Sequence, residues 1–268
     1  MDTQSLFSLA GRTALVTGGS RGIGKMIASG FIGQGAKVYI SSRKADVCES
    51  VAAELGPNCI AVPQDISTVD GCKALAATMA AHEDHVDILV NNAGAAWGEA
   101  FETFPEAGWD KVMNLNVKSI FFLTQAMHGL LKAGACAEKP AKVINIASID
   151  GLRPNPWETY SYQASKAAVI NLTKRLAARL VKDGILVTGI APGAFASEMN
   201  KAARDLGDIV GQHVPAGRIG NDEDMAGVAI YLAARSGDYV VGETITVDGG
   251  VVHAFLTESW EVDPAGGH

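Results

Sequence analysis

The sequence predicts an α/β fold, in which one parallel sheet is covered by helices on both faces. The chief observation is a repeated alternation of short apolar runs with longer segments of helical periodicity. A second is that turns of glycine and other small residues follow several of the apolar runs, as happens where strands lead into helices. The 268 residues, 48% of them hydrophobic, suffice for one sizeable core, so we expect a single domain over residues 1–268.

Composition excludes several other kinds of protein. The formal net charge is -7 and there is no basic cluster, which argues against a nucleic-acid partner or an anionic membrane surface. The sequence contains no run of ~18 apolar residues, so we expect no membrane span. Residues 1–4 lack the pattern of a signal peptide. The four cysteines include no Cys-x-x-Cys pair, which indicates reduced thiols and a cytoplasmic location.

A glycine-rich turn follows the first predicted strand. Residues 12–17 form a compact β-type run, residues 18–24 are the turn, and a helical pattern continues through Phe31. A strand, a glycine turn and a helix N-terminus together make a phosphate cradle, because backbone N–H groups can approach an anion there. The alternative is a tight turn that holds no ligand.

The second predicted strand, residues 37–42, ends without a carboxylate. NAD-binding versions of this arrangement commonly place an acidic residue there to hold the ribose hydroxyls. Here Ser42 is followed by Arg43, and Arg21 lies in the glycine turn. These residues suit a 2′-phosphate and hence NADP(H), although solvated surface charges are the alternative.

The remaining elements continue the alternation. His82 and His85, on an amphipathic stretch, make a poor metal site by themselves, so we expect no metal. The predicted helices cover 44–55, a stretch to about 84, 105–133, the Tyr162 helix to about 182, and 222–234. The predicted strands cover 59–64, 87–90, 143–147, 186–190 and 243–247. Residues 194–217 resemble a mobile lid over a substrate, and 251–268 form a tail.

Residues near the fifth predicted strand carry proton-transfer chemistry. Ser148 closes that strand, and Tyr162 and Lys166 lie four residues apart on one face of the next helix. A lysine held close to a phenol is expected to lower the phenol pKa, so that Tyr162 could exchange a proton near neutral pH. Asn116 lies amid apolar neighbours, where it is either a core hydrogen-bonding residue or an opening of the helix to a water.

The chain resembles the classical short-chain dehydrogenase/reductase family through motifs that recur along nearly its whole length. The motifs are Thr17-Gly18-x-x-x-Gly22-Ile23-Gly24, Asp65, Asn91-Asn92-Ala93-Gly94, Asn116, Ser148, Tyr162-x-x-x-Lys166, Pro192-Gly193 and Asp248-Gly249-Gly250. The resemblance implies a Rossmann fold with seven parallel strands, usually assembled as a homotetramer or homodimer. It also implies that Tyr162 is the general acid/base, that Ser148 orients the substrate carbonyl, and that Asn116 supports a proton-relay water.

The resemblance and the phosphate cradle together predict the NADP(H) site. Lys166 is implied to hold the nicotinamide ribose, and Ser197 stands where the family often has a threonine. The expected cofactor-binding residues are Gly18, Ser20, Arg21, Gly22, Ile23, Gly24, Ser42, Arg43, Asp65, Ile66, Asn92, Ala93, Gly94, Tyr162, Lys166, Pro192, Gly193, Phe195 and Ser197.

Within the family the chain is similar to bacterial 3-oxoacyl-(acyl carrier protein) reductases, and among these to the subgroup associated with rhamnolipid synthesis. Residues 7–12 and the glycine turn carry that similarity. The segment from Ser148 to Tyr162 is longer than usual, and it carries Arg153 and Trp157. The expected pocket lining is Ala95, Trp97, Asp150, Leu152, Arg153, Trp157 and Phe195. Arg153 either pairs with Asp150 or Glu158 to hold the loop, or attracts an anionic ketone.

The expected activity is NADPH-dependent interconversion of a ketone and a secondary alcohol, with a 3-oxoacyl thioester as the favoured substrate. A polyol, sugar or other secondary-alcohol dehydrogenase is the enzymatic alternative. A non-catalytic NADP-sensing protein on the same fold is the alternative from another class. The intact serine, tyrosine and lysine count against a sensor, since a sensor has no need of them.

Overall fold

A computed structural model describes residues 2–198 and 200–254. Its centre is a seven-stranded parallel sheet in the order β3-β2-β1-β4-β5-β6-β7. The strands are β1 (Thr13–Thr17), β2 (Lys37–Ser41), β3 (Cys59–Ala61), β4 (Ile88–Asn91), β5 (Ala141–Ile146), β6 (Ile185–Pro192) and β7 (Thr244–Val247). The order reverses between β1 and β4, so the chain forms the predicted doubly wound, Rossmann-like fold.

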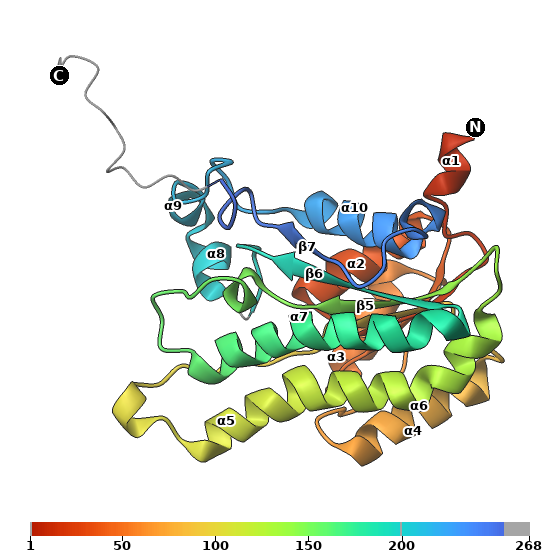
Figure 1. Cartoon of the computed structure of the whole chain (residues 1–268), viewed down its shortest axis with the longest axis horizontal. Coiled ribbons are helices and arrows are strands. Elements are labelled where there is room, and N and C mark those ends of the chain that lie inside the picture. The colour runs from red at the N-terminus through yellow and green to blue at the C-terminus, as the bar shows by residue number, and fades with distance from the viewer. Residues whose placement is uncertain (1, 199, 255–268) are drawn as a thin grey trace.

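Helices cover both faces of the sheet (Figure 1). The longer helices are α2 (Gly22–Gly33), α3 (Ala45–Leu55), α4 (Val69–His82), α5 (Glu106–Met113), α6 (Ser119–Gly134), α7 (Tyr160–Leu180) and α10 (Asp222–Ala233). Apolar residues of α2, α3 and α10 pack on one face, and those of α4, α6 and α7 on the other. Strands buried on both faces explain the nearly continuous apolar runs of the sequence. Among the described residues, no helix has both the length and the apolar character that crossing a membrane requires.

The short helices lie in the connections. They are α1 (Thr3–Leu6), α8 (Lys201–Asp205), α9 (Gly207–Gly211) and the 3-10 turns η1 (Phe101–Thr103), η3 (Ile149–Gly151), η4 (Val181–Asp183) and η5 (Arg235–Gly237). The predicted lid, residues 194–217, therefore contains two short helices. Most of the predicted tail, residues 255–268, falls outside the described residues.

Two predicted elements differ from the structure. The third strand ends at Ala61 rather than at residue 64, although the Gln64 N–H beyond it still donates to the Ser42 carbonyl at 3.0 Å. The single helix predicted over 105–133 is α5 and α6 joined by η2, a π-helical turn at Asn114–Lys118. Such a turn widens the helix, and π turns are frequent at functional sites.

Ion pairs close the amino-terminal edge of the sheet, the edge opposite the carboxyl ends of the strands. The carboxylate of Asp87 is fully buried, and it accepts a hydrogen bond from the Thr13 N–H at 2.8 Å. The Arg12 guanidinium lies 3.7 Å from Asp87. On the neighbouring strand, the ammonium of Lys142, a buried side chain, lies 2.7 Å from the Asp238 carboxylate. We call these residues the amino-edge ion pairs.

Candidate active site

Three side chains meet where β5 ends. Ser148 lies just beyond that strand, and Tyr162 and Lys166 stand in the first turns of α7. The Lys166 ammonium donates a hydrogen bond of 2.8 Å to the backbone carbonyl of Ile146. The same nitrogen lies 5.5 Å from the centre of the Tyr162 ring. A hydroxyl, a phenol and an ammonium thus converge at the carboxyl edge, where open α/β sheets bind their ligands.

Hydrogen bonds orient the serine. The Ser148 hydroxyl accepts the N–H of Asp150 at 3.1 Å and so caps the short turn η3. The hydroxyl also hydrogen-bonds with the side chains of Asp150 and Tyr162, so a substrate oxygen that accepts its proton replaces one of these partners. Ser148 is buried, so a bond to its hydroxyl meets little competition from water.

The electrostatics of the tyrosine contradict the expectation from sequence. Burial raises the pKa of Tyr162 to about 12, although a hydrogen bond with Ser148 acts to lower it and the charge of Asp150 adds to the rise. Burial also lowers the pKa of Lys166 to about 8, against the opposing effect of Asp150. Lys166 therefore does not lower the pKa of Tyr162 in this structure, and the phenol keeps its proton near neutral pH. A protonated phenol is the form that can donate to a carbonyl oxygen.

Asn116 lies in the π turn, and protein groups satisfy its side chain. Its amide oxygen accepts the Ala95 N–H at 2.8 Å. Its amide nitrogen donates to the Ala95 carbonyl and to the Ser165 hydroxyl, each at 2.9 Å. Ser165 in turn donates to the Tyr162 carbonyl at 2.7 Å. The asparagine therefore ties the loop after β4 to the backbone of Tyr162, and its side chain is a hydrogen-bonding residue of the core.

The glycine turn leaves the N-terminus of α2 open to an anion. No side chain of the described residues caps the first turn of this helix. Gly22 has a positive φ of 49°, and a β-carbon at Gly24 would lie only 2.3 Å from the Gly18 carbonyl oxygen. These positions therefore require glycine. The uncapped N–H groups and the helix dipole fit a phosphate of a dinucleotide.

The loop after β4 is fastened to the glycine turn. The Thr17 hydroxyl accepts the N–H groups of Asn92 and Ala93, at 3.0 and 3.1 Å. The Asn92 amide donates to the carbonyls of Thr17 and Gly18, at 2.9 and 3.2 Å. Gly94 follows beside the Asn116 amide oxygen. The predicted residues Asn92, Ala93 and Gly94 thus form a fixed wall next to the cradle.

Two exposed arginines stand beside the turn, as a 2′-phosphate would require. Within the described part of the chain, the side chains of Arg21 and Arg43 make no hydrogen bond or ion pair with another residue. The half-buried Ser42 lies between the end of β2 and Arg43. Asp65 is exposed after β3 and accepts the Ser67 N–H at 2.9 Å, whereas the Ile66 side chain is buried in the core. Ile66 therefore has only its backbone to offer a cofactor.

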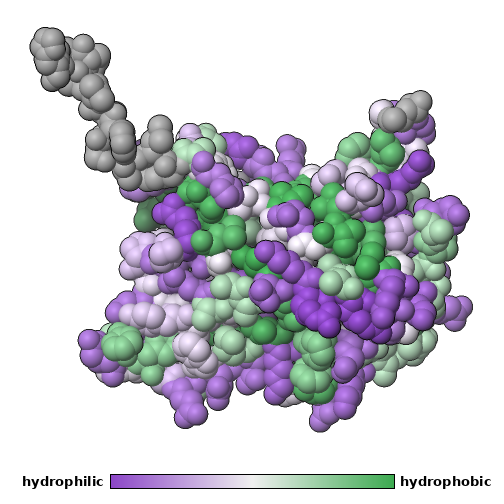
Figure 2. All heavy atoms as spheres, viewed as in Figure 1, coloured by the Kyte–Doolittle hydropathy of each residue, from purple (hydrophilic) through white to green (hydrophobic). Residues whose placement is uncertain are grey.

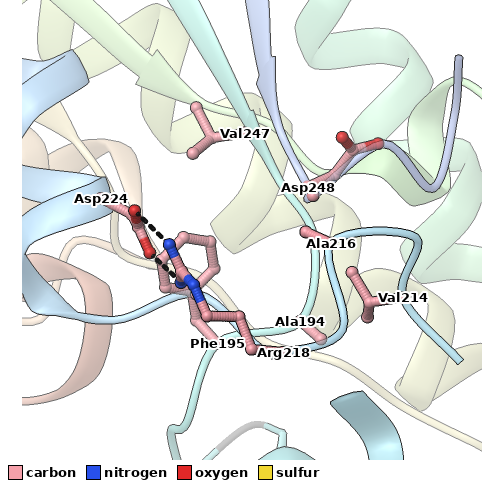
Figure 3. Close-up of a pocket in the computed structure, with 10 residues that line it drawn as sticks. Ala194, Phe195, Val214, Ala216, Arg218, Asp224, Val247 and Asp248 are labelled. Carbon is pink, nitrogen blue, oxygen red and sulfur yellow. Dashed lines mark hydrogen bonds and ion pairs between the residues drawn. The ribbon is translucent and has the colours of Figure 1, made fainter. Parts of the chain in front are cut away.

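The start of the lid lies over the glycine turn. A β-carbon at Gly22 would be 3.1 Å from the Cβ of Ser197, which places Ser197 next to the cradle. The ring of Phe195 is buried against Gly220. It lines a separate cavity of about 100 Å³ that also holds the paired side chains of Arg218 and Asp224 (Figure 3). The expectation that this ring lines the substrate pocket is therefore wrong.

Only some of the other expected pocket residues lie near Ser148 and Asn116. Asp150 is half-buried next to Ser148, and Ala95 is held by Asn116. The indole of Trp97 instead packs on Gly108 of α5, with the Lys111 ammonium 5.1 Å from its ring centre. Trp157 is 67% exposed and Leu152 is 43% exposed. Trp157 lines an aromatic groove, which also includes Phe101, Phe104, Trp109, Pro154, Pro156 and Tyr160.

Arg153 holds the long loop through the backbone. Its guanidinium donates a hydrogen bond of 2.6 Å to the carbonyl of Val251, at the start of the tail. Its positive charge also acts to lower the pKa of Asp150, although burial raises that pKa more strongly. Arg153 therefore holds the loop, as one of the two interpretations predicts, but it does so through the Val251 carbonyl, a partner that the sequence did not indicate.

Sequence reasoning missed a chain of buried polar side chains behind the site. The Asn91 amide donates to the Thr124 hydroxyl at 3.2 Å and to the Asn145 amide oxygen at 2.9 Å. The Asn145 amide donates to the Thr173 hydroxyl at 3.0 Å. This Asn91–Asn145 chain links α6, β4, β5 and α7. The available signal was an asparagine at the carboxyl-terminal end of each of two largely apolar strands.

Comparison with known proteins agrees with this geometry. The profile of the family described as short chain dehydrogenase matches residues 12–206. The chain therefore belongs to the short-chain dehydrogenase family and is an oxidoreductase.

Individual relatives span nearly the whole chain. A rhamnolipids biosynthesis 3-oxoacyl-[acyl-carrier-protein] reductase of Pseudomonas aeruginosa is 46% identical over 249 residues, which cover 91% of this chain and 97% of the relative. The structure described as the Pseudomonas aeruginosa RhlG/NADP active-site complex has a TM-score of 0.89 and 45% identity, covering 92% of this chain and 99% of that one. A gluconate 5-dehydrogenase from Burkholderia cenocepacia, in complex with NADP and tartrate, has a TM-score of 0.86 and 33% identity, covering 94% and 99%.

Proposed function

We propose that the protein is an NADPH-dependent reductase that converts a ketone into a secondary alcohol, with a 3-oxoacyl thioester as the favoured substrate. The observation that carries the proposal is the convergence of Ser148, Tyr162 and Lys166 at the carboxyl end of β5. The relative from Pseudomonas aeruginosa, a 3-oxoacyl-[acyl-carrier-protein] reductase, supports this choice of substrate class.

The chain's own residues account for the movement of the proton. Bound NADPH supplies a hydride to the carbonyl carbon. Ser148, with its oxygen already fixed by the Asp150 N–H, donates a hydrogen bond to the carbonyl oxygen and so holds it beside Tyr162. Tyr162 stays protonated because its pKa is about 12, and it gives its proton to that oxygen. Lys166 is held by the Ile146 carbonyl and is the cation next to the phenol.

Preference for NADP over NAD follows from Arg21, Arg43 and Ser42. A charge-assisted hydrogen bond to phosphate contributes roughly 1.5–3 kcal/mol, which is about ten- to a hundredfold in affinity. Replacing Ser42 by Asp and Arg43 by Leu should shift the preference toward NAD, because a carboxylate repels the phosphate and accepts ribose hydroxyls. Fluorescence titration with each cofactor measures the shift. Tighter binding of NADH than NADPH by the unmodified protein contradicts this part of the proposal.

The substrate class is tested by NADPH oxidation. The panel contains 3-oxoacyl thioesters of several chain lengths, keto-sugars and keto-gluconates, and simple cyclic ketones. We expect the highest kcat/KM for a thioester. A secondary-alcohol dehydrogenase is the second candidate, because relatives at 39% and 33% identity are sugar-acid dehydrogenases. Turnover of gluconate-type substrates alone would favour that candidate, and the absence of turnover with any carbonyl compound would refute both.

Assembly into a homotetramer or homodimer is part of the proposal. β7 is an edge strand whose residues are all half-buried, and Val241 and Tyr239 before it are exposed. Figure 2 shows apolar side chains over β6 and β7, above a polar band along α7. An apolar surface at the edge of a sheet is typical of a contact with another chain. A cytoplasmic location is supported by the described cysteines, which are free thiols.

A further inference from the structure

Asp150 holds a carboxylate in the active site that the proton-transfer chemistry does not use. It belongs to η3, which begins directly after Ser148. Gly151 fixes this turn against α7, since a β-carbon there would lie 2.5 Å from the backbone carbonyl carbon of Lys166. The turn therefore cannot shift without moving either the serine or the catalytic helix. Its carboxylate is half-buried beside Ser148 and Asn155.

The charged groups near this carboxylate already have other partners. Lys166 donates to the Ile146 carbonyl, and Arg153 donates to the Val251 carbonyl at 2.6 Å. No salt bridge within 4.0 Å involves Asp150 and another described residue. The carboxylate acts electrostatically on both Tyr162 and Lys166, which shows that it lies near the reacting groups. A carboxylate in such a position, unused by the reaction, is a candidate for substrate recognition.

We propose that Asp150 is a specificity-determining residue, which selects ketones that are uncharged beside the reacting carbonyl and rejects those that carry a free carboxylate there. The proposal rests on the reductase function above and specifies its substrate class further. A thioester, ester or amide is neutral at this place, so it brings no second negative charge next to Asp150. A free acid brings a second negative charge into a site with little water, where like charges repel strongly.

The proposed preference for neutral ketones is the opposite of the preference for anionic ketones that Arg153 suggests from sequence alone. Arg153 is exposed on the loop after η3 and bonded to the Val251 carbonyl, whereas Asp150 is half-buried beside Ser148. The less solvated charge has the larger effect on a bound substrate, because water screens an exposed one. Asp150 therefore outweighs Arg153 in the choice of substrate.

The experiment compares two small ketones of opposite kind, freshly prepared 3-oxobutanoate, which is charged, and its methyl ester, which is neutral and larger by one methyl group. Wild-type protein with saturating NADPH should give a kcat/KM for the ester at least about tenfold above that for the acid. Asp150→Asn keeps the shape and removes the charge, so it should reduce this ratio about tenfold, chiefly through a lower KM for the acid. Glu158→Gln is the matched control, since its carboxylate contacts Tyr160 and the Phe101 N–H outside the site, and it should leave the ratio unchanged.

A second variant keeps the test decisive if Asp150→Asn folds poorly. Arg153→Gln removes the neighbouring cation, so it should raise the ester-to-acid ratio above the wild-type value. An unchanged ratio in Asp150→Asn with NADPH binding intact, or an equal loss on both ketones, overturns the proposal. An Arg153→Gln ratio that does not rise also overturns it. Failure of the wild type to reduce either ketone or any thioester refutes the reductase function instead.

Discussion

At the scale of single residues, the pairing of Tyr162 with Lys166 distinguishes one tyrosine from its neighbour. Tyr160 lies two residues earlier, but its hydroxyl donates to Glu158 at 3.0 Å and its ring packs on Phe101 and Phe104. Tyr160 is thus part of the aromatic groove, while Tyr162 lies with Ser148 and Lys166 in the proposed catalytic group. The sequence predicts this distinction, because only Tyr162 has a lysine one helical turn later.

Tyr162→Phe should lower kcat by about 10²–10⁴-fold, because it removes the general acid, while NADPH still binds. Tyr160→Phe should keep most of the activity, since it loses only an exposed hydrogen bond. Stopped-flow measurement of NADPH oxidation, with a fluorescence titration of the cofactor, provides both quantities. Comparable losses in the two folded variants would defeat the assignment.

The pH dependence follows from the raised and lowered pKa values of the pair. Tyr162, with a pKa of about 12, keeps its proton throughout the usual range, so it does not limit reduction at high pH. Lys166, with a pKa of about 8, is charged below that pH and becomes neutral above it. We expect kcat/KM for ketone reduction to fall as the pH rises through about 8. A pH–rate profile that stays flat to pH ~10 would exclude this role of Lys166.

At the scale of elements, the Asn91–Asn145 chain joins the strands that carry the site to the helices that cover them. Buried amides are stable only when their hydrogen bonds are made, so each member depends on the others. Asn145→Ala leaves the Asn91 amide and the Thr173 hydroxyl without this partner. Its free energy of unfolding should fall by about 3 kcal/mol.

Urea denaturation followed by circular dichroism measures the effect of Asn145→Ala. Asn58→Ala is the matched control: its side chain is exposed before β3, and its change should stay within about 0.5 kcal/mol. Equal stability of the two variants would mean that the Asn91–Asn145 chain adds nothing to the fold.

The sequence was sufficient for the alternating elements and for the places of Ser148, Tyr162 and Lys166 at the end of β5 and in the first turns of α7. It was not sufficient for the features that depend on contacts between distant segments. The π turn at Asn116 arises because its side chain bonds to Ala95, and the pKa of Tyr162 rises because of burial. Spacing along a helix shows which side chains share a face but not how far water is excluded from them. For the same reason, Phe195 and Trp97 were expected to face a substrate but instead pack on Gly220 and Gly108.

At the scale of the whole molecule, the half-buried edge strand β7 is the contact through which we propose that copies of the chain assemble. Val241 is 41% exposed next to this edge, so Val241→Lys places a charge at the proposed contact. Light scattering should show the wild type at a multiple of 27.9 kDa and the variant shifted to smaller species. Val47→Lys, which changes a similarly exposed valine on α3, should leave the mass unchanged. A wild-type monomer at micromolar concentration would contradict the proposed assembly.

The amino-edge ion pairs lie at one end of the strands and the proposed catalytic residues at the other. β5 illustrates the separation, since Lys142 stands near its beginning and Ser148 follows its end, roughly 20 Å away at about 3.3 Å per residue. Random variation or directed evolution can therefore act on the two ends independently. Substitutions around Lys142 and Asp238 offer a way to raise the melting temperature without changing kcat/KM. Changes of substrate, in contrast, can be sought in the segment that follows Ser148 while heat tolerance is left as it is.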